Sequence, residues 1–145
     1  MILFAAATAA DVPDIKALLA ENDLPTAGVD DHWKAFVVAR EGRALAGCGG
    51  AEVFDGAALI RSIAVAAPRR GSGIGDQIVH RLLDDLKKRG VAELYLLTTT
   101  AEEYFRKRGF EKVDRGHVPP QLLRSREFQD ACPASAACMR LIVNG

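Results

Sequence analysis

The segment from Ala67 to Gln77, APRRGSGIGDQ, constrains the fold of this chain more than any other stretch. An apolar run precedes it and a helical pattern follows it, so we expect a glycine-rich turn between a strand and a helix. Gly71, Gly73 and Gly75 lack a Cβ, so another group can approach the main chain closely. The first N–H groups of a helix lack intrahelical partners and lie at the positive end of its dipole. The turn is therefore predicted to bind a phosphate or pyrophosphate.

Two common phosphate-binding signatures do not fit this turn. A Walker loop requires Gly-Lys-Ser/Thr, whereas this chain has Gly75-Asp76. A dinucleotide fingerprint requires glycine at position 76, and it opens a βαβ unit, whereas this turn follows extended segments in the middle of the chain. The remaining alternative is a flexible charged loop that binds nothing.

Length and charge indicate one domain, residues 1–145, without a strong external field. The 19 basic and 19 acidic side chains cancel, which disfavours nucleic acid and anionic membranes as partners. No segment approaches the roughly 18 apolar residues of a membrane span. The opening MILFAAATAA lacks the basic start of a signal peptide, so we expect a buried first strand there. The three cysteines fit neither a disulfide framework nor a zinc site, so a reducing cytoplasm is the expected location.

Hydrophobic periodicity predicts the order of the elements. Asp11 is a candidate N-cap for a helix that starts near Pro13, and turns at Glu41-Gly42 and Asp55-Gly56 separate three antiparallel strands. A long amphipathic helix over 74–89 follows, with Gly90 as its C-cap residue. After it come a buried strand, a short helix that Gly109 closes, another strand, a helix near 120–131 and a last strand near 137–143. Together these elements predict one mixed-sheet domain.

Two motifs in this order carry a family resemblance. Residues 70–75, RGSGIG, match the pattern R/Q-x-x-G-x-G/A, and residues 101–110, AEEYFRKRGF, match A-x-x-x-[YF]-x-x-x-G-F. Both resemble the GCN5-related N-acetyltransferase (GNAT) superfamily, whose element order also fits nearly the whole chain. The resemblance implies an α/β (α+β) fold, with a mixed, mostly antiparallel sheet of six to seven strands flanked by helices. It also implies an enzyme that transfers an acetyl group from acetyl-CoA to an amine.

Three further segments are similar to one branch of that superfamily, the arsenic-resistance N-acetyltransferases. They are LIRSIAV at 59–65, LYLLTTTAEEYFRKRGF at 94–110 and EFQDACPASAACM at 127–139. The branch is named after the operons that encode it. The resemblance therefore implies a role in detoxification and leaves the substrate open.

The resemblance also implies which residues hold acetyl-CoA. The pyrophosphate is expected on the main-chain N–H groups of the turn, and the pantetheine is expected to pair with the preceding strand. An N–H near Ala64 or Val65 would then polarise the thioester carbonyl. The residues so implied are Ile63, Ala64, Val65, Arg70, Gly71, Ser72, Gly73, Ile74, Gly75 and, at the aromatic position of the second motif, Phe105.

The sequence departs from the superfamily pattern at the catalytic positions. Phe105 stands where a tyrosine acid is common, and Tyr104 lies one residue earlier, about 100° around the helix. Tyr104 is therefore the candidate acid, with packing as the alternative role. A thiol of pKa ~8.5 leaves as thiolate with little assistance, so the change is tolerable.

The acceptor site is expected to favour an anionic group. Arg61 and Ser62 stand where many members carry acidic residues, and a cation there would hold a carboxylate, arsonate or phosphinate. Thr98, in place of a common asparagine, and Thr99 are the other candidate acceptor contacts. Glu52 on the neighbouring strand is the candidate base, with an ion pair to Arg61 as a compatible alternative. The expected acceptor is a small amine that resembles an amino acid.

Alternatives of a different kind stay open at this point. The same chemistry applies to a protein lysine or N-terminus, and the missing tyrosine and acids also fit a silent domain that only senses acyl-CoA. Dimerisation is common in the superfamily, so a homodimer is compatible. Cys48, Cys132 and Cys138 form an odd set without Cys-x-x-Cys spacing, so neither a disulfide framework nor a metal is expected. An arsenic site of three cysteines is disfavoured because Cys48 falls in a strand core.

Overall fold

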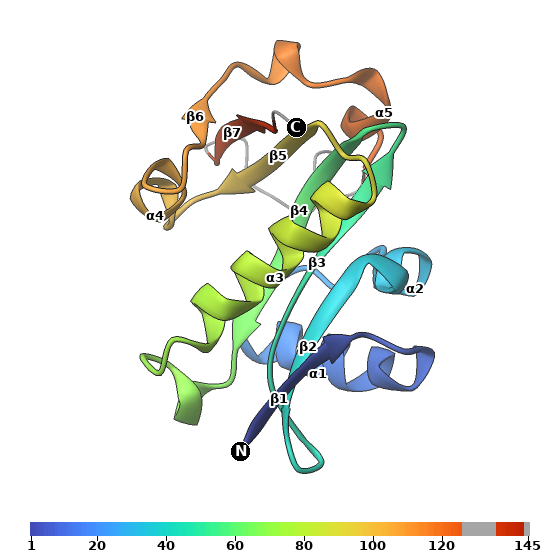
Figure 1. The fold of residues 1–145 in the computed structure, drawn as a ribbon, viewed down its shortest axis with the longest axis vertical. Helices are drawn as coiled ribbons and strands as arrows, with labels where there is room; N and C mark the ends of the chain where they lie inside the picture. The colour runs from blue at the N-terminus through green and yellow to red at the C-terminus, as the bar shows by residue number, and fades with distance from the viewer. Residues whose placement is uncertain (126–135, 144–145) are drawn as a thin grey trace.

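The computed structural model describes residues 1–125 and 136–143, which form a seven-stranded sheet with helices on both faces (Figure 1). The strand order is β1-β2-β3-β4-β5-β7-β6. The strands are β1 (Ile2–Ala6), β2 (Phe36–Glu41), β3 (Ala44–Phe54), β4 (Ala57–Val65), β5 (Glu93–Thr98), β6 (Glu111–Lys112) and β7 (Ala137–Ile142). The α-helices are α1 (Val12–Glu21), α2 (Val29–His32), α3 (Ile74–Lys88), α4 (Glu102–Arg106) and α5 (Pro120–Leu123). All neighbouring strands are antiparallel except β4 and β5, which confirms the predicted mixed sheet.

Local sequence signals placed most elements correctly. The two predicted hairpin turns join β2 to β3 and β3 to β4, and Gly90 follows the end of α3. The helix expected over 120–131 begins at Pro120 as α5 but ends at Leu123, so the prediction was wrong at Arg124 and Ser125, which form a turn and a bend. The rest of the predicted helix, 126–131, lies outside the described residues. The segment 127–139 also lies mostly outside them. None of the described helices is both long enough and apolar enough to cross a membrane.

The first strand differs from the expectation of a buried strand. β1 is an edge strand that pairs only with β2, and the Leu3 side chain is 64% exposed. Ile2 and Phe4 pack against the cluster that contains Ile74 and Ile78, whereas Leu3 points away from it. Successive side chains of a strand alternate between the two faces, so an apolar run at a sheet edge buries only half of its residues.

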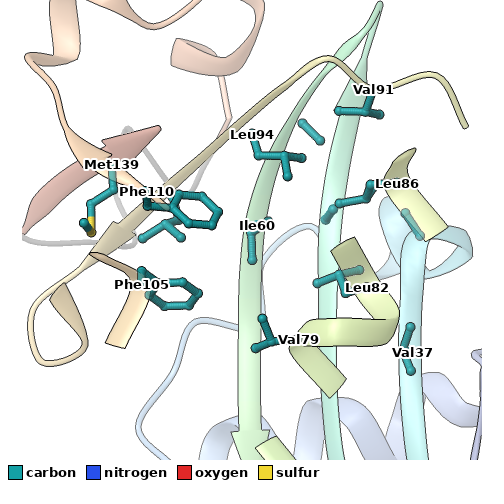
Figure 2. Close-up of a cluster of buried hydrophobic side chains, with 14 residues drawn as sticks. Val37, Ile60, Val79, Leu82, Leu86, Val91, Leu94, Phe105, Phe110 and Met139 are labelled. Atoms are coloured by element: carbon teal, nitrogen blue, oxygen red, sulfur yellow. The ribbon is translucent and has the colours of Figure 1, made fainter. Parts of the chain in front are cut away.

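α3 and α1 cover opposite faces of the sheet. Val79, Leu82 and Leu86 of α3 point toward Ile60 and other strand residues in the largest core cluster (Figure 2). On the other face, Ile15, Leu18 and Leu19 of α1 pack with Phe36, Val38 and Cys48. Adjacent residues such as Val37 and Val38 thus belong to different clusters, as the pleat of β2 requires. The sheet is therefore buried on both faces in its middle.

The parallel pair β4–β5 is short, and its strands separate. Pairing runs from Ala57 with Glu93 to Ile60 with Leu96, after which Leu97 and Thr98 pair only with β7. At the same level, the register between β3 and β4 shifts between Cys48 and Gly50. Ser62 takes φ +62° there, so β4 contains a bulge. The bulge in β4 and the separation of β4 from β5 together open the sheet just beyond Ile60.

Gly50 provides a test of how tightly β2 and β3 pack. A Cβ added at this position would lie 2.1 Å from the Phe36 ring, which is itself 1% exposed and so has no room to move. We expect Gly50→Ala to lower the free energy of unfolding by about 1–3 kcal/mol, measured by urea denaturation. Gly116→Ala, where a Cβ meets no atom within 4 Å, is the control and is expected to change stability by less than ~0.5 kcal/mol. Equal stabilities of the two variants would contradict this packing.

Candidate active site

A cavity of about 470 Å³ occupies the place where β4 and β5 separate. One side is formed by α3 and α4, with Gly75, Asp76 and Tyr104 among its residues. The other side is formed by the loop Asp23–Pro25, which follows α1. Because α1 and α3 cover opposite faces, the cavity connects the two faces of the sheet through the gap. Two molecules can therefore meet in it from opposite sides.

The glycine-rich turn forms the start of α3, as its sequence predicted. Gly73 is the N-cap residue with φ +85°, and the N–H of Gln77 donates to its carbonyl at 3.1 Å. The N–H of Arg70 donates to Ala67 at 3.3 Å, so the free helix N–H groups lie between these two bonds. Gly75 passes close to β4, because a Cβ there would lie 3.4 Å from Val65. The geometry is that of an anion site at a helix N-terminus.

The far end of β4 presents a free edge beside this turn. Ala64 pairs with Cys48 and Val65 with Gly47 on the β3 side, whereas the β5 side is already unpaired beyond Ile60. Ile63 lines the cavity directly, and Phe105 of α4 lines it from the opposite side of the gap. An extended chain with amide groups can add to such an edge by main-chain hydrogen bonds.

Tyr104 is held by two partners inside the cavity wall. Its hydroxyl donates to Asp76 Oδ1 at 2.8 Å, and the Arg108 guanidinium stacks 3.5 Å above its ring and pairs with Asp76. Loss of solvent contact raises the pKa of the Tyr104 phenol above its usual value. Sequence reasoning missed Asp76 and Arg108 as its partners; the available signal was an acidic residue in the first turn of the helix after the glycines.

Arg61 and Glu52 form a buried ion pair on the α1 side of the sheet. Arg61 Nη1 lies 2.8 Å from Glu52 Oε2, and each residue is 3% exposed. The Arg61 Nε donates to Ser62 Oγ at 2.8 Å, and Nη2 donates to the Pro25 carbonyl at 3.3 Å. Arg61 and Ser62 line the main cavity, whereas Glu52 lines a second cavity. The sequence predicted the pairing as an alternative role for Glu52, and this contact is present.

Glu52 also lines a second cavity of about 310 Å³, together with His32, Ser125 and Gly28. His32 Nε2 lies 3.4 Å from Glu52 Oε1, and Ser125 Oγ donates to Glu52 Oε2 at 3.1 Å. Gly28 closes over the pair, because a Cβ there would lie 2.8 Å from Arg61 Nη1. None of these three residues was a sequence candidate, since they come from separate segments and only the fold brings them to Glu52.

The candidate threonines line the main cavity, whereas the described cysteines lie in the core. Thr98 and Thr99 both line the main cavity, and Thr98 Oγ1 also accepts a hydrogen bond from the Ala101 N–H at 2.9 Å. Cys48 and Cys138 are buried in separate clusters, and Cys132 lies outside the described residues. Across residues 1–125 and 136–143, no group of three His, Cys, Asp or Glu side chains is arranged to hold a metal ion.

Comparison with known proteins gives matches in sequence and in structure. The family model described as acetyltransferase (GNAT) domain matches residues 32–112. An amino-acid acetyltransferase of Aeromonas salmonicida is 29% identical over 98 residues, which cover 66% of this chain and 22% of that protein. An amino-acid acetyltransferase of Neisseria meningitidis is 25% identical over 120 residues, which cover 75% of this chain and 27% of that protein. The chain thus spans about a quarter of the length of these curated relatives.

Two solved structures share nearly the whole fold. Rv2747 from Mycobacterium tuberculosis, in complex with CoA and NLQ, has a TM-score of 0.80 at 25% identity and covers 98% of this chain and 99% of its own. The N-acetylglutamate synthase of Neisseria gonorrhoeae, complexed with coenzyme A and N-acetyl-glutamate, has a TM-score of 0.83 at 19% identity. The match covers 100% of this chain and 36% of the synthase.

The buried thiol of Cys48 yields a prediction about stability in alkali. Burial raises the pKa of this thiol from 9.0 to about 12, so the unfolded chain loses the proton first as the pH rises. Stability that is complete below pH 9.0 is therefore lost toward pH 12, by up to ~1.4 kcal/mol per pH unit. Urea denaturation at stepped pH is expected to show a steeper decline for the unmodified protein than for Cys48→Ala. Parallel declines would show that Cys48 ionises equally easily in both states.

Proposed function

The chain belongs to the acetyltransferase (GNAT) family, and we propose that it transfers the acetyl group of acetyl-CoA to the primary amine of a small anionic acceptor. The observation that carries this proposal is the cavity through the sheet, with an anion site at one end and a buried arginine at the other. An acyl donor with phosphates and an acceptor with an anionic group fit these two ends.

The residues of the donor end fit coenzyme A. The N–H groups between Arg70 and Gln77 are the proposed contacts of its pyrophosphate, in a turn whose glycines leave the main chain open. The free edge of β4 from Ile63 to Val65 is the proposed partner of its amide-bearing arm. Acetyl-CoA supplies the activated acyl group, and the protein orients it and offers a main-chain N–H near Ala64 to its carbonyl oxygen.

Arg61 is the proposed contact of the acceptor's anionic group. It is buried, positively charged and held by three hydrogen bonds that leave further N–H donors in its planar guanidinium. Relatives named amino-acid acetyltransferase, and the complex with N-acetyl-glutamate, support an amino-acid-like acceptor. Because residues 59–65 and 94–110 resemble the arsenic-resistance branch, we extend the proposed acceptors to arsonate and phosphinate analogues of amino acids.

Glu52 is proposed to act on the acceptor, and Tyr104 is proposed to act on the leaving thiolate of CoA. Glu52 contacts Arg61 and faces the second cavity, which supports a role in orienting Arg61 more than a direct role as base. Tyr104 lies across the gap with its hydroxyl on Asp76, and it is the proposed proton donor to the leaving thiolate.

Turnover separates this proposal from its alternatives. A silent acyl-CoA sensor binds the donor and releases no free CoA when amines are added. A protein acetyltransferase releases CoA with peptides that carry a free lysine or N-terminus and not with free amino acids. The proposed enzyme releases CoA with small amines that carry an anionic group.

Gly73→Ala tests the donor end. Gly73 and Gly42 have φ +85° and +61°, and a Cβ added at either would meet open space, so alanine strains both positions by a similar ~1 kcal/mol. Gly73 belongs to the glycine-rich turn before α3, whereas Gly42 lies in the hairpin turn between β2 and β3. We expect Gly73→Ala to weaken CoA binding about tenfold or more by isothermal titration calorimetry, and Gly42→Ala to bind CoA as the unmodified protein does. Equal CoA affinity in both variants would remove the turn from the donor site.

A charge-balanced variant tests the acceptor end. Removing Arg61 alone leaves Glu52 buried without its partner, which costs about 3–5 kcal/mol and confuses folding with function. The double variant Arg61→Met and Glu52→Gln avoids that charge. We expect it to bind CoA normally and to raise KM about 10- to 100-fold for amino acids but not for the corresponding decarboxylated amines. An equal rise for both kinds of acceptor would contradict the anion-binding role of Arg61.

A further inference from the structure

We propose that Asp23 binds the ammonium group of the acceptor and so makes the site selective for zwitterions. This inference rests on the proposed function, to which it adds a second charged contact. Asp23 lines the same cavity as Arg61, from the loop after α1. A carboxylate and a guanidinium in the wall of one cavity match the two charges of an amino acid.

The backbone at Asp23 is unfavourable for the residue that occupies it. α1 ends in a Schellman motif, in which the N–H of Asp23 donates to Ala20 at 3.2 Å and the N–H of Leu24 donates to Leu19 at 2.9 Å. Asp23 takes φ +57°, the left-handed conformation for which this position prefers glycine. The chain does place glycine after α3 and α4, at Gly90 with φ +82° and Gly109 with φ +97°. Of these three helices, α1 is the one that carries a carboxylate there, and its end lies at the cavity.

The charge at Asp23 is unfavourable as well. The C-terminal end of a helix carries partial negative charge, which a carboxylate opposes, and the last turn of α1 has no basic residue. The Asp23 side chain is exposed, and in the part of the chain that the structure describes it makes no hydrogen bond or ion pair. No side-chain contact within these described residues therefore compensates for the two costs, whereas a bound cation would relieve the cost of the charge.

The other carboxylates near the cavity already have side-chain partners. Asp76 contacts Tyr104 and Arg108, and Glu52 contacts Arg61. Asp23 is thus the carboxylate of the cavity wall that has a charge to offer to a ligand. An ammonium group placed there would contact both the carboxylate and the negative end of α1.

Contacts on either side hold Asp23 in place. The Asn22 side chain donates to the Leu18 carbonyl at 2.9 Å and accepts a hydrogen bond from Arg70 Nη2 at 2.6 Å. On the other side, the Pro25 carbonyl accepts a hydrogen bond from Arg61 at 3.3 Å. Asp23 is therefore fixed between the glycine-rich turn and the buried arginine, which are the two proposed ligand contacts.

Asp23→Asn tests the inference with readouts that separate folding from function. Asparagine tolerates positive φ and removes the charge, so we expect the thermal unfolding midpoint to rise by about 2 °C. We also expect KM for the best L-amino acid acceptor to rise about 10- to 100-fold, with KM for acetyl-CoA unchanged. The inhibition constant of the des-amino analogue of that acceptor is expected to stay the same, because this analogue has no ammonium to lose.

Asp55→Asn is the matched control. Asp55 also has positive φ, +41°, and lies in the turn between β3 and β4, away from the residues that line the cavity. We expect its kinetic constants to match those of the unmodified protein. Unchanged KM in a folded Asp23→Asn protein would overturn the inference, as would an equal loss of affinity for the des-amino analogue. If the unmodified protein acetylates no amino acid, the proposed function fails and the inference fails with it.

Discussion

The separation of β4 from β5 is the constraint on which the candidate site depends. Two parallel strands that stayed paired to their ends would close the sheet and leave no free main-chain edge. Here pairing stops at Ile60 and Leu96, where the bulge at Ser62 turns β4 away while β5 continues beside β7. A non-glycine residue at positive φ costs about 1–3 kcal/mol, which the flanking pairs of β3 and β4 sustain. The free edge, the cavity and the position of Arg61 all follow from this local strain.

The ion pair between Arg61 and Glu52 determines the character of the acceptor end. Burying two charges costs several kcal/mol per ion, and the pair is stable only because its remaining polar atoms are also satisfied. Ser62, Pro25, Ser125 and His32 supply those contacts from four separate segments. Such an arrangement contributes little to net stability compared with an apolar core, which is consistent with the proposed role of Arg61 in the acceptor site.

Local signals made most of the fold and the glycine-rich turn predictable from the sequence. The glycine turn, the helix it starts and the hairpin turns depend on neighbouring residues. Ile63 and Gly75 of the predicted donor site line the cavity, and the roles of the motif residues stay a prediction. The prediction that β1 is buried was wrong, because an apolar run does not reveal which strand lies at the edge of the sheet. The partners of Glu52 and the pairing of Tyr104 with Asp76 depend on contacts between residues far apart in the chain. A single sequence carries no periodic signal for such contacts.

The hydrogen bond from Arg70 to Asn22 joins the glycine-rich turn to the end of α1. An anion that draws the Arg70 guanidinium away from Asn22 breaks this bond and thereby removes one contact of the loop that lines the cavity. Thermodynamic linkage makes such an effect reciprocal, so a molecule held by the loop changes the affinity of the turn by the same factor. A single exposed side chain is thus a route by which an anion at the turn and a molecule at the loop would influence each other, and the order in which the two arrive would not alter the total free energy of binding both.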